Sequence, residues 1–205
     1  HGGGPQIAEK LKNKNITSKF IEGLRVTDID TVKVVEDVLA NDINAEIVKS
    51  IRDSGGKAIG LSGNKNNLLS ATKLKIEKKD SDSNIEKLID IGFVGQPTKV
   101  NISLIKENIS KGEIPVIAPL GVGADNNSYN INADTAAGFI AGELKASKLL
   151  LLTDVAGILD KEKKLISSLT MDDASKLINE DFVIGGMKPK ILTCIEAMKK
   201  GVNKT

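Results

Sequence analysis

Three consecutive glycines followed by a proline open the sequence, at His1–Gln6 (HGGGPQ). Glycines between a strand and a helix let backbone N–H groups approach an anion closely, and proline suits the first turn of a helix. We therefore predict an anion-binding loop, with a plain tight turn as the alternative, because isolated glycine motifs have many false positives. A glycine run forms no regular structure by itself, so we expect this loop to be entered from an element that precedes His1.

Arginine is rare in this chain. Arg25, within Gly23–Asp28 (GLRVTD), and Arg52 are the only two, and lysine supplies the other strongly basic side chains. A planar guanidinium binds a carboxylate through two parallel hydrogen bonds, which a lysine cannot do. We therefore predict that Arg25 binds a carboxylate ligand, with a surface salt bridge as the alternative.

The segment Tyr129–Leu144 (YNINADTAAGFIAGEL) predicts a helix whose start carries a carboxylate. Asn132 or a neighbour can cap this helix, and Asp134 lies in its first turn. There the helix dipole keeps the carboxylate ionised, so that it can orient cations; the alternative is that Asp134 only serves the helix start. Small residues form a smooth face that we expect to pack on a sheet: Ala136, Ala137, Gly138, Ala141 and Gly142.

The segment Leu149–Asp160 (LLLLTDVAGILD) predicts a buried strand that ends at Thr153 and Asp154 and is followed by Gly157. In open α/β sheets, ligands bind beyond the carboxyl ends of the strands. The polar residues at this strand end are therefore candidate ligand contacts. A turn capped by the aspartate is the alternative.

Two lysines, Lys188 and Lys190, stand at the expected start of a helix within Val183–Lys190 (VIGGMKPK). Cations are unfavourable at a helix N-terminus because the helix dipole is positive there. Their presence predicts an anionic ligand that compensates the charge. Exposure to solvent is the alternative, since it would make the cost small.

Hydrophobic spacing outlines the remaining elements. Apolar residues recur at the three- to four-residue period of an amphipathic helix in the segments 32–39, 43–51, 102–109 and 191–198, and Gly55-Gly56 is expected to end the second. Runs of branched residues predict strands at Ala58–Leu61, Pro115–Leu120 and Leu149–Val155. Alternation within Leu68–Ile76, followed by charged Lys78–Asn84, predicts an antiparallel hairpin. Strands that alternate with helices indicate an α/β fold with a largely buried parallel sheet.

Composition excludes several classes of protein. The 29 basic and 27 acidic residues of the 205 nearly cancel and are scattered, so neither nucleic acid nor an anionic membrane is an expected partner. A single cysteine, Cys194, excludes a disulfide framework and a cysteine-rich metal site. The longest apolar run, Leu149–Leu152, is too short to span a bilayer. We expect a cytoplasmic protein that binds a small molecule.

Six motifs together resemble the amino acid kinase family, and within it the members that phosphorylate N-acetyl-L-glutamate. In chain order they are HGGGPQI, GLRVTD, GGKAIGLSG, NINADTAA, LLTDVAGILD and GGMKPK, and the resemblance covers essentially the whole chain. Each motif is weak alone, but six in order are specific. The resemblance implies a three-layer αβα sandwich with a largely parallel central sheet, incomplete at both termini. It implies one domain, 1–205, in which about 1–145 bind the amino-acid substrate and form the dimer, and 146–205 begin the ATP-binding lobe.

The resemblance also implies roles for individual residues. Gly2 and Gly3 resemble backbone donors to the substrate, whereas Arg25 and Asn130 resemble the residues that bind it, Arg25 through its α-carboxylate. Asp134 resembles the aspartate that organises two catalytic lysines. Five residues resemble part of the ATP site: Thr153, Asp154, Gly157, Ile158 and Leu159.

Lys190 resembles the second of the two catalytic lysines. The first would lie upstream of His1, so we expect the 205-residue chain to be inactive by itself. Lys188 departs from the pattern, because the family usually has an apolar residue at this position.

The implied reaction moves the γ-phosphoryl group of ATP, with Mg²⁺, to the side-chain carboxylate of N-acetyl-L-glutamate in the second step of arginine biosynthesis. That carboxylate is ionised at neutral pH and needs no general base, which suits a chain whose only histidine is His1. The resemblance further implies a homodimer or a hexamer, with arginine as a possible effector.

Three alternatives remain open at this point. Another kinase of the same fold would act on aspartate, glutamate, carbamate or a nucleoside monophosphate. A non-catalytic sensor would bind an amino acid alone. A dinucleotide-binding oxidoreductase is disfavoured, because His1–Gln6 lacks the Gly-x-Gly-x-x-Gly spacing.

Overall fold

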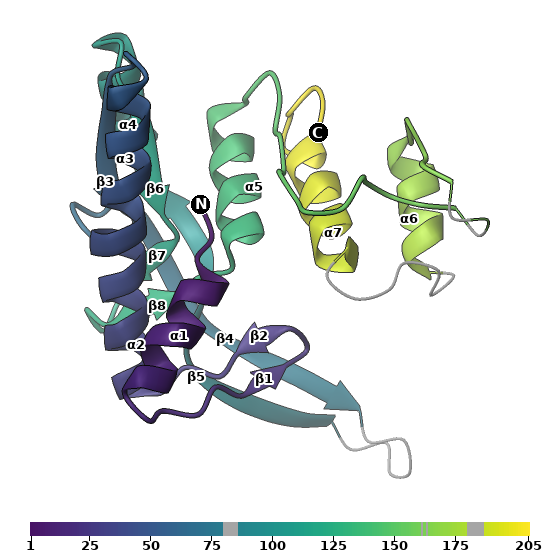
Figure 1. Cartoon of the computed structure of the whole chain (residues 1–205). Coiled ribbons are helices and arrows are strands. Elements are labelled where there is room, and N and C mark those ends of the chain that lie inside the picture. Colours follow the sequence, from purple (N-terminus) through teal and green to yellow (C-terminus); the bar gives the residue numbers. More distant parts are fainter. Residues whose placement is uncertain (80–85, 161, 163, 180–186) are drawn as a thin grey trace. The chain divides into compact units, whose positions relative to one another are not determined.

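A computed structural model describes residues 1–79, 86–160, 162, 164–179 and 187–205 of the chain (Figure 1). The chain divides into two compact units, His1–Ala133 and Asp134–Thr205. Each unit is described by itself below. Most of the predicted charged turn, at 80–84, and the segment 183–186 lie outside the described residues.

Helices form in the first unit where the hydrophobic period predicted them, in the segments 32–39, 43–51 and 102–109, and after the glycine run, where Pro5 predicted one. The first helix, α1 (Gly4–Asn13), has Pro5 in its first turn, as expected. The side chain of Asp28 caps the next helix, α2 (Ile29–Glu36), because its Oδ1 accepts the N–H of Thr31 at 2.8 Å. No glycine or proline interrupts 37–43, so α2, the π-helical turn η1 and α3 form one continuous helical segment that ends before Gly55, at φ 84° (Figure 1). The bounds are α1 Gly4–Asn13, α2 Ile29–Glu36, η1 Asp37–Ile43, α3 Asn44–Asp53 and α4 Ile102–Ser110.

The strands of the first unit form small mixed sheets. The first pair, β1 and β2, is an antiparallel hairpin, and β3 pairs with β6 in parallel. A closed four-strand barrel has the order β4-β5-β8-β7, in which the predicted hairpin β4–β5 is confirmed as antiparallel. The bounds are β1 Phe20–Ile21, β2 Leu24–Arg25, β3 Ala58–Ser62, β4 Leu69–Lys79, β5 Glu86–Val100, β6 Ile114–Ala118, β7 Leu120–Val122 and β8 Ser128–Asn130.

The α/β class is thus confirmed, whereas the described strands do not form one largely parallel sheet. Short connections account for the difference, because strands joined by a few residues can pair only in the antiparallel sense. Among the described strands only β3 and β6, between which β4, β5 and α4 (Ile102–Ser110) lie in the sequence, form an extended parallel ladder, from the pair Ala58–Ile114 to the pair Ser62–Ala118.

The core of the first unit joins its helices to the end of β6 and to β7. Buried side chains from α1, the long helical segment and these strands form one cluster, which includes Leu11, Val35, Leu39, Ala118 and Leu120. Continuity of this cluster fixes α1, and hence the glycine run that precedes it, against the helical segment.

The second unit contains three described helices, α5 Ala133–Leu144, α6 Met171–Asn179 and α7 Met187–Lys199. The helix predicted around 191–198 is therefore confirmed. Across the described parts of both units, no helix is long and apolar enough to cross a lipid bilayer.

The strand predicted over Leu149–Val155 is wrong. The segment is irregular, and Leu150 and Leu152 are 70% and 91% exposed. A backbone hydrogen bond forms at the start of the segment, where the N–H of Leu149 donates to the carbonyl of Lys204 at 2.9 Å. A strand is stabilised by a neighbouring strand, and the described residues of this unit provide none.

The small face of α5 packs on α7, whereas the sequence predicted a sheet as its partner. A Cβ added to Gly138 would lie 2.4 Å from Cγ2 of Thr193, and one added to Gly142 would lie 2.8 Å from Cδ of Lys200. Lys200 also pairs with Glu143 at 2.8 Å. The glycines are therefore needed for the close approach of the two helices.

We expect Gly138→Ala to destabilise the protein by about 1–3 kcal/mol, the usual cost of overpacking a tight contact. The midpoint of chemical denaturation measures this loss. Gly4→Ala is the matched control, because a Cβ there meets nothing within 4 Å in α1 and alanine favours a helix. Equal midpoints for the two variants would contradict the proposed α5–α7 contact.

Candidate functional site

The guanidinium of Arg25 is held from three sides in the first unit. Its Nη1 donates to the hydroxyl of Ser18, its Nη2 donates to the carbonyl of Gly4 at 3.3 Å, and its Cζ lies 4.6 Å from the centre of the Phe20 ring. Arg25 is only 8% exposed, and burial lowers the pKa of its guanidinium, which nevertheless stays charged at neutral pH.

No carboxylate in the described part of the chain forms an ion pair with Arg25. The surface salt bridge considered as its alternative role is therefore absent there. A buried cation without a counter-ion is costly, so this arrangement favours an anionic ligand.

Asn130 is connected to Arg25 through a residue that the sequence analysis missed. Its Nδ2 donates to the hydroxyl oxygen of Thr27 at 3.4 Å, and the Thr27 hydroxyl donates to the carbonyl of Arg25 at 2.7 Å. Thr27 is fully buried and is bonded to β5 by its own backbone, which accepts the N–H of Phe93 at 2.6 Å and donates to the carbonyl of Ile91 at 2.9 Å. Thr27 thus connects the backbone of Arg25 to β5 and to Asn130 of β8, two strands of the barrel.

The backbone of the barrel must approach Thr27 closely. Gly92 has a φ of 80°, and a Cβ there would lie 2.1 Å from the carbonyl oxygen of Thr27. Thr27 was within a quoted motif, but only its burial reveals its role.

Close packing around Gly3 requires a glycine at this position, in addition to the substrate contact predicted for it. A Cβ on Gly3 would lie 2.4 Å from Cδ1 of Ile43 and 2.8 Å from Cδ2 of Leu39. A Cβ on Gly2 would come no closer than 3.9 Å to Ala133. Contact of either backbone with a substrate stays a prediction, although the bond from Arg25 to Gly4 brings the glycine run beside the guanidinium.

Asn44 is a second residue that the sequence analysis missed. It is 4% exposed, and its Nδ2 lies 2.9 Å from the carbonyl oxygen of Val116, to which it donates, and 3.2 Å from Nε2 of His1. A Cβ on Gly60 would lie 2.2 Å from its Oδ1. Asn44 therefore joins α3 to the strand pair β3–β6. An amide within the apolar period of 43–51 was the available signal.

Asp134 and Lys190 form an ion pair in the second unit. The Nζ of Lys190 donates to both carboxylate oxygens, at 3.0 and 2.9 Å, and the two side chains are 23% and 22% exposed. Asp134 lies in the first turn of α5, as predicted, and Lys190 lies near the start of α7. The sequence predicted an anionic ligand that compensates the lysines at this helix start. In the structure a protein carboxylate, that of Asp134, compensates Lys190, and the binding of a ligand stays a prediction.

The residues predicted to contact ATP lie in an irregular part of the second unit: Thr153, Asp154, Gly157, Ile158 and Leu159. The first two are exposed, and the Thr153 hydroxyl donates to Asp154 at 3.3 Å. The last two pair with the chain that follows, through an antiparallel bridge to Leu165 and a 2.8 Å bond from the N–H of Ile166. Their contact with a nucleotide stays a prediction.

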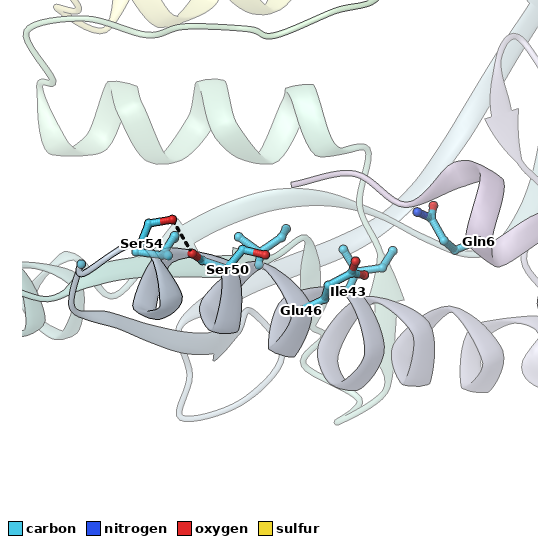
Figure 2. A pocket seen from close by; sticks show the side chains of 8 residues that line it. Gln6, Ile43, Glu46, Ser50 and Ser54 are labelled. Carbon is cyan, nitrogen blue, oxygen red and sulfur yellow. Dashed lines mark hydrogen bonds between the residues drawn. The ribbon is translucent and has the colours of Figure 1, made fainter.

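Two pockets of the first unit contain none of the predicted site residues. One, of about 590 Å³, follows one face of the helical segment from the end of η1 to the end of α3, where Ile43, Glu46, Ser50 and Ser54 line it together with Gln6 of α1 (Figure 2).

The second pocket, of about 430 Å³, includes Glu36, Asn44 and Lys65. Burial alone would raise the pKa of Glu36, but hydrogen bonds from Asn64, Ser128 and Lys65 hold it below its ordinary value. The carboxylate of Glu36 thus has hydrogen-bond partners within the protein.

The predicted site residues are divided between the two units. Gly2, Gly3, Arg25 and Asn130 belong to His1–Ala133, and Asp134, Lys190 and the predicted ATP contacts belong to Asp134–Thr205. The boundary between the units follows Asn130 by three residues. The assignment of 1–145 and 146–205 to two lobes stays a prediction.

Comparison with known proteins identifies the class to which this fold and site belong. The model of the amino acid kinase family matches residues 1–205. A solved structure, smu.665 from Streptococcus mutans UA159, superposes with a TM-score of 0.85 at 29% identity, over 98% of this chain and 77% of that one. The chain belongs to the amino acid kinase family.

Within that family the chain groups with the acetylglutamate kinases. It is 54% identical to the acetylglutamate kinase of Afipia carboxidovorans over 202 residues, which are 98% of this chain and 68% of the relative. It is 52% identical to that of Rhodospirillum centenum, over 98% of this chain and 66% of the relative. The chain thus spans about two thirds of the length of these relatives.

Proposed function

We propose that this chain carries the substrate-binding and phosphoryl-transfer residues of an enzyme that uses ATP to phosphorylate the side-chain carboxylate of N-acetyl-L-glutamate. The product is N-acetylglutamyl 5-phosphate, and the reaction is the second step of arginine biosynthesis. The observation that carries this proposal is the buried guanidinium of Arg25, which has no carboxylate partner among the described residues.

In this proposal Arg25 binds the α-carboxylate of the substrate. Ser18 and Gly4 use two of its five N–H groups, which leaves donors for a carboxylate. Asn130, connected to Arg25 through the hydroxyl of Thr27, contacts the substrate beside it, and the backbone N–H groups of Gly2 and Gly3 bind it from the loop.

Lys190 stabilises the charge that develops on the transferred phosphoryl group. An ammonium has three donors; two bond Asp134, and the third remains for a phosphoryl oxygen. Asp134 is then a positioning residue, which holds Lys190 and accepts no proton. The attacking carboxylate is already ionised, so catalysis requires positioning and charge stabilisation, and alignment of the two substrates contributes on the order of 7–11 kcal/mol.

ATP is assigned to the loop that carries Thr153, Asp154 and Gly157–Leu159. Magnesium is expected to arrive with the phosphates of ATP, where it neutralises charge. Kinases ordinarily bind it through one or two carboxylates plus phosphates, and no group of three or more His, Cys, Asp or Glu side chains in the described ranges could hold a metal. The described residues therefore offer no dedicated metal cage, and no step above depends on one.

We also propose for this protein the finer features that the family resemblance implies. They are the three-layer sandwich, the lobes at 1–145 and 146–205, assembly as a homodimer or a hexamer, arginine as an effector, and a cytoplasmic location. The motifs GLRVTD and NINAD support the choice of substrate.

A panel of acceptors tests the function. ADP release by the full-length enzyme with ATP and Mg²⁺ should be fastest with N-acetyl-L-glutamate, by kcat/KM, over L-aspartate, L-glutamate, carbamate and UMP. A higher kcat/KM with any of the other four acceptors would mean that this acceptor, and not N-acetyl-L-glutamate, is the substrate. Binding of N-acetyl-L-glutamate without binding of ATP, measured by calorimetry, would support the sensor instead.

A further inference from the structure

We propose that Phe20 is a positioning residue for Arg25: its ring orients the guanidinium that binds the substrate carboxylate. This inference rests on the proposed function of Arg25. It assigns a task to an exposed aromatic side chain that core packing does not explain.

Hairpin geometry places the two side chains opposite each other. Phe20 on β1 and Arg25 on β2 are register partners in the antiparallel pair. The two connecting residues, Glu22 and Gly23, have φ values of 49° and 79°. Positive φ at both central residues is the signature of the tight turn whose twist suits a hairpin, and turn type fixes the register. The contact is therefore built into the backbone.

The exposed fractions of the two residues indicate that the ring shields the guanidinium from solvent, and not the reverse. Phe20 is 57% exposed and Arg25 is 8% exposed. The ring thus covers the guanidinium, with 4.6 Å between its centre and Cζ, while much of the ring itself faces solvent. Aromatic residues make up only 2% of the chain, so an aromatic at this exposed strand position calls for a specific partner.

The ring supplies what the two hydrogen bonds to Arg25 cannot. Ser18 and Gly4 accept hydrogen bonds from Nη1 and Nη2 of the guanidinium, whereas Cζ lies over the Phe20 ring, 4.6 Å from its centre. A carboxylate is bound bidentately only when the guanidinium plane is correctly oriented. The negative face of the ring attracts the cation and excludes water from one side, which fixes that plane before substrate arrives.

Substitution of Phe20 separates this role from simple packing. Phe20→Leu keeps an apolar side chain but removes the ring, and we expect it to raise the KM for N-acetyl-L-glutamate about two- to fivefold, the range for an exposed cation–π contact. The KM for ATP and kcat should not change. Phe20→Tyr retains the ring and should restore the KM to within about twofold of the wild-type value.

The matched control is Phe139→Leu, which makes the same change beneath another cation, Lys200, whose Nζ lies 4.0 Å from that ring. It should leave the KM for N-acetyl-L-glutamate unchanged. An unchanged KM in Phe20→Leu, an equal rise in both KM values, or a Phe20→Tyr variant as impaired as Phe20→Leu would overturn the inference. Failure of the wild-type enzyme to phosphorylate N-acetyl-L-glutamate would instead refute the proposed function, and this inference with it.

Discussion

Replacing Lys190 with methionine is expected to lower kcat about 10²- to 10³-fold while the KM for N-acetyl-L-glutamate stays nearly unchanged. This is the usual loss when one transition-state charge stabiliser is removed. Methionine keeps much of the length and apolar stem of lysine but has no charge, so packing near the start of α7 should persist. Steady-state kinetics of the full-length enzyme measure the effect.

Two further variants separate catalysis from structure. Lys199→Met is the matched control on the same helix, because Lys199 is exposed and pairs only locally, with Glu196 at 2.8 Å; its kcat should equal that of the wild type. Asp134→Asn should lower kcat with Lys190 present and have little added effect in the Lys190→Met background, since the two act as a unit. A Lys190→Met enzyme with unchanged kcat would contradict the role of the pair.

Replacing Arg25 with lysine is expected to raise the KM for N-acetyl-L-glutamate roughly ten- to a hundredfold, with little change in the KM for ATP. The range follows from the worth of hydrogen bonds to a charged group. Lysine retains the charge, but a point charge cannot reproduce a bidentate contact, nor the bonds that the guanidinium makes to Ser18 and Gly4. Initial rates at varied concentrations of each substrate test this.

Arg52→Lys is the natural control for that experiment, because Arg52 is the other arginine. Its Nε and Nη2 both donate to the carbonyl of Ala58, at 3.1 and 2.7 Å. The same substitution there should lower the denaturation midpoint and leave both KM values unaltered. If Arg25→Lys raised both KM values equally, Arg25 would be structural.

Residue patterns within short segments of the sequence correctly predicted the helices α4 and α7 and the hairpin β4–β5. The helices α4 and α7 follow the apolar period, and α4 is capped by Asn101, whose side chain accepts the N–H of Leu104 at 3.3 Å. The hairpin β4–β5 likewise follows from alternation and a charged turn.

Features that depend on distant partners could not be predicted in this way. The apolar run at Leu149–Val155 looked like a strand, but a strand needs a neighbour, and none lies in the described part of its unit. Similarly, a small-residue face can pack on a helix or a sheet, and only the structure shows that Gly138 meets Thr193.

The same distinction applies to the residues of the candidate site, because only some of them could be found from the sequence alone. The rarity of arginine singled out Arg25 from the sequence alone. The pairing of Asp134 with Lys190, 56 residues apart, followed only from the family resemblance. Thr27 and Phe20 act through burial and cross-strand register, which no residue pattern displays.

Trapping the product with hydroxylamine tests the central claim most directly. An acyl phosphate reacts with hydroxylamine to give a hydroxamate and inorganic phosphate, so the modified carbon marks the carboxylate that accepted the phosphoryl group. With the full-length enzyme, ATP, Mg²⁺ and N-acetyl-L-glutamate, we expect a hydroxamate at the side-chain carbon, located by fragmentation in a mass spectrometer, in an amount equal to the ADP formed. ADP formation without a hydroxamate, or a hydroxamate at the α-carboxylate that Arg25 is proposed to hold, would contradict the account.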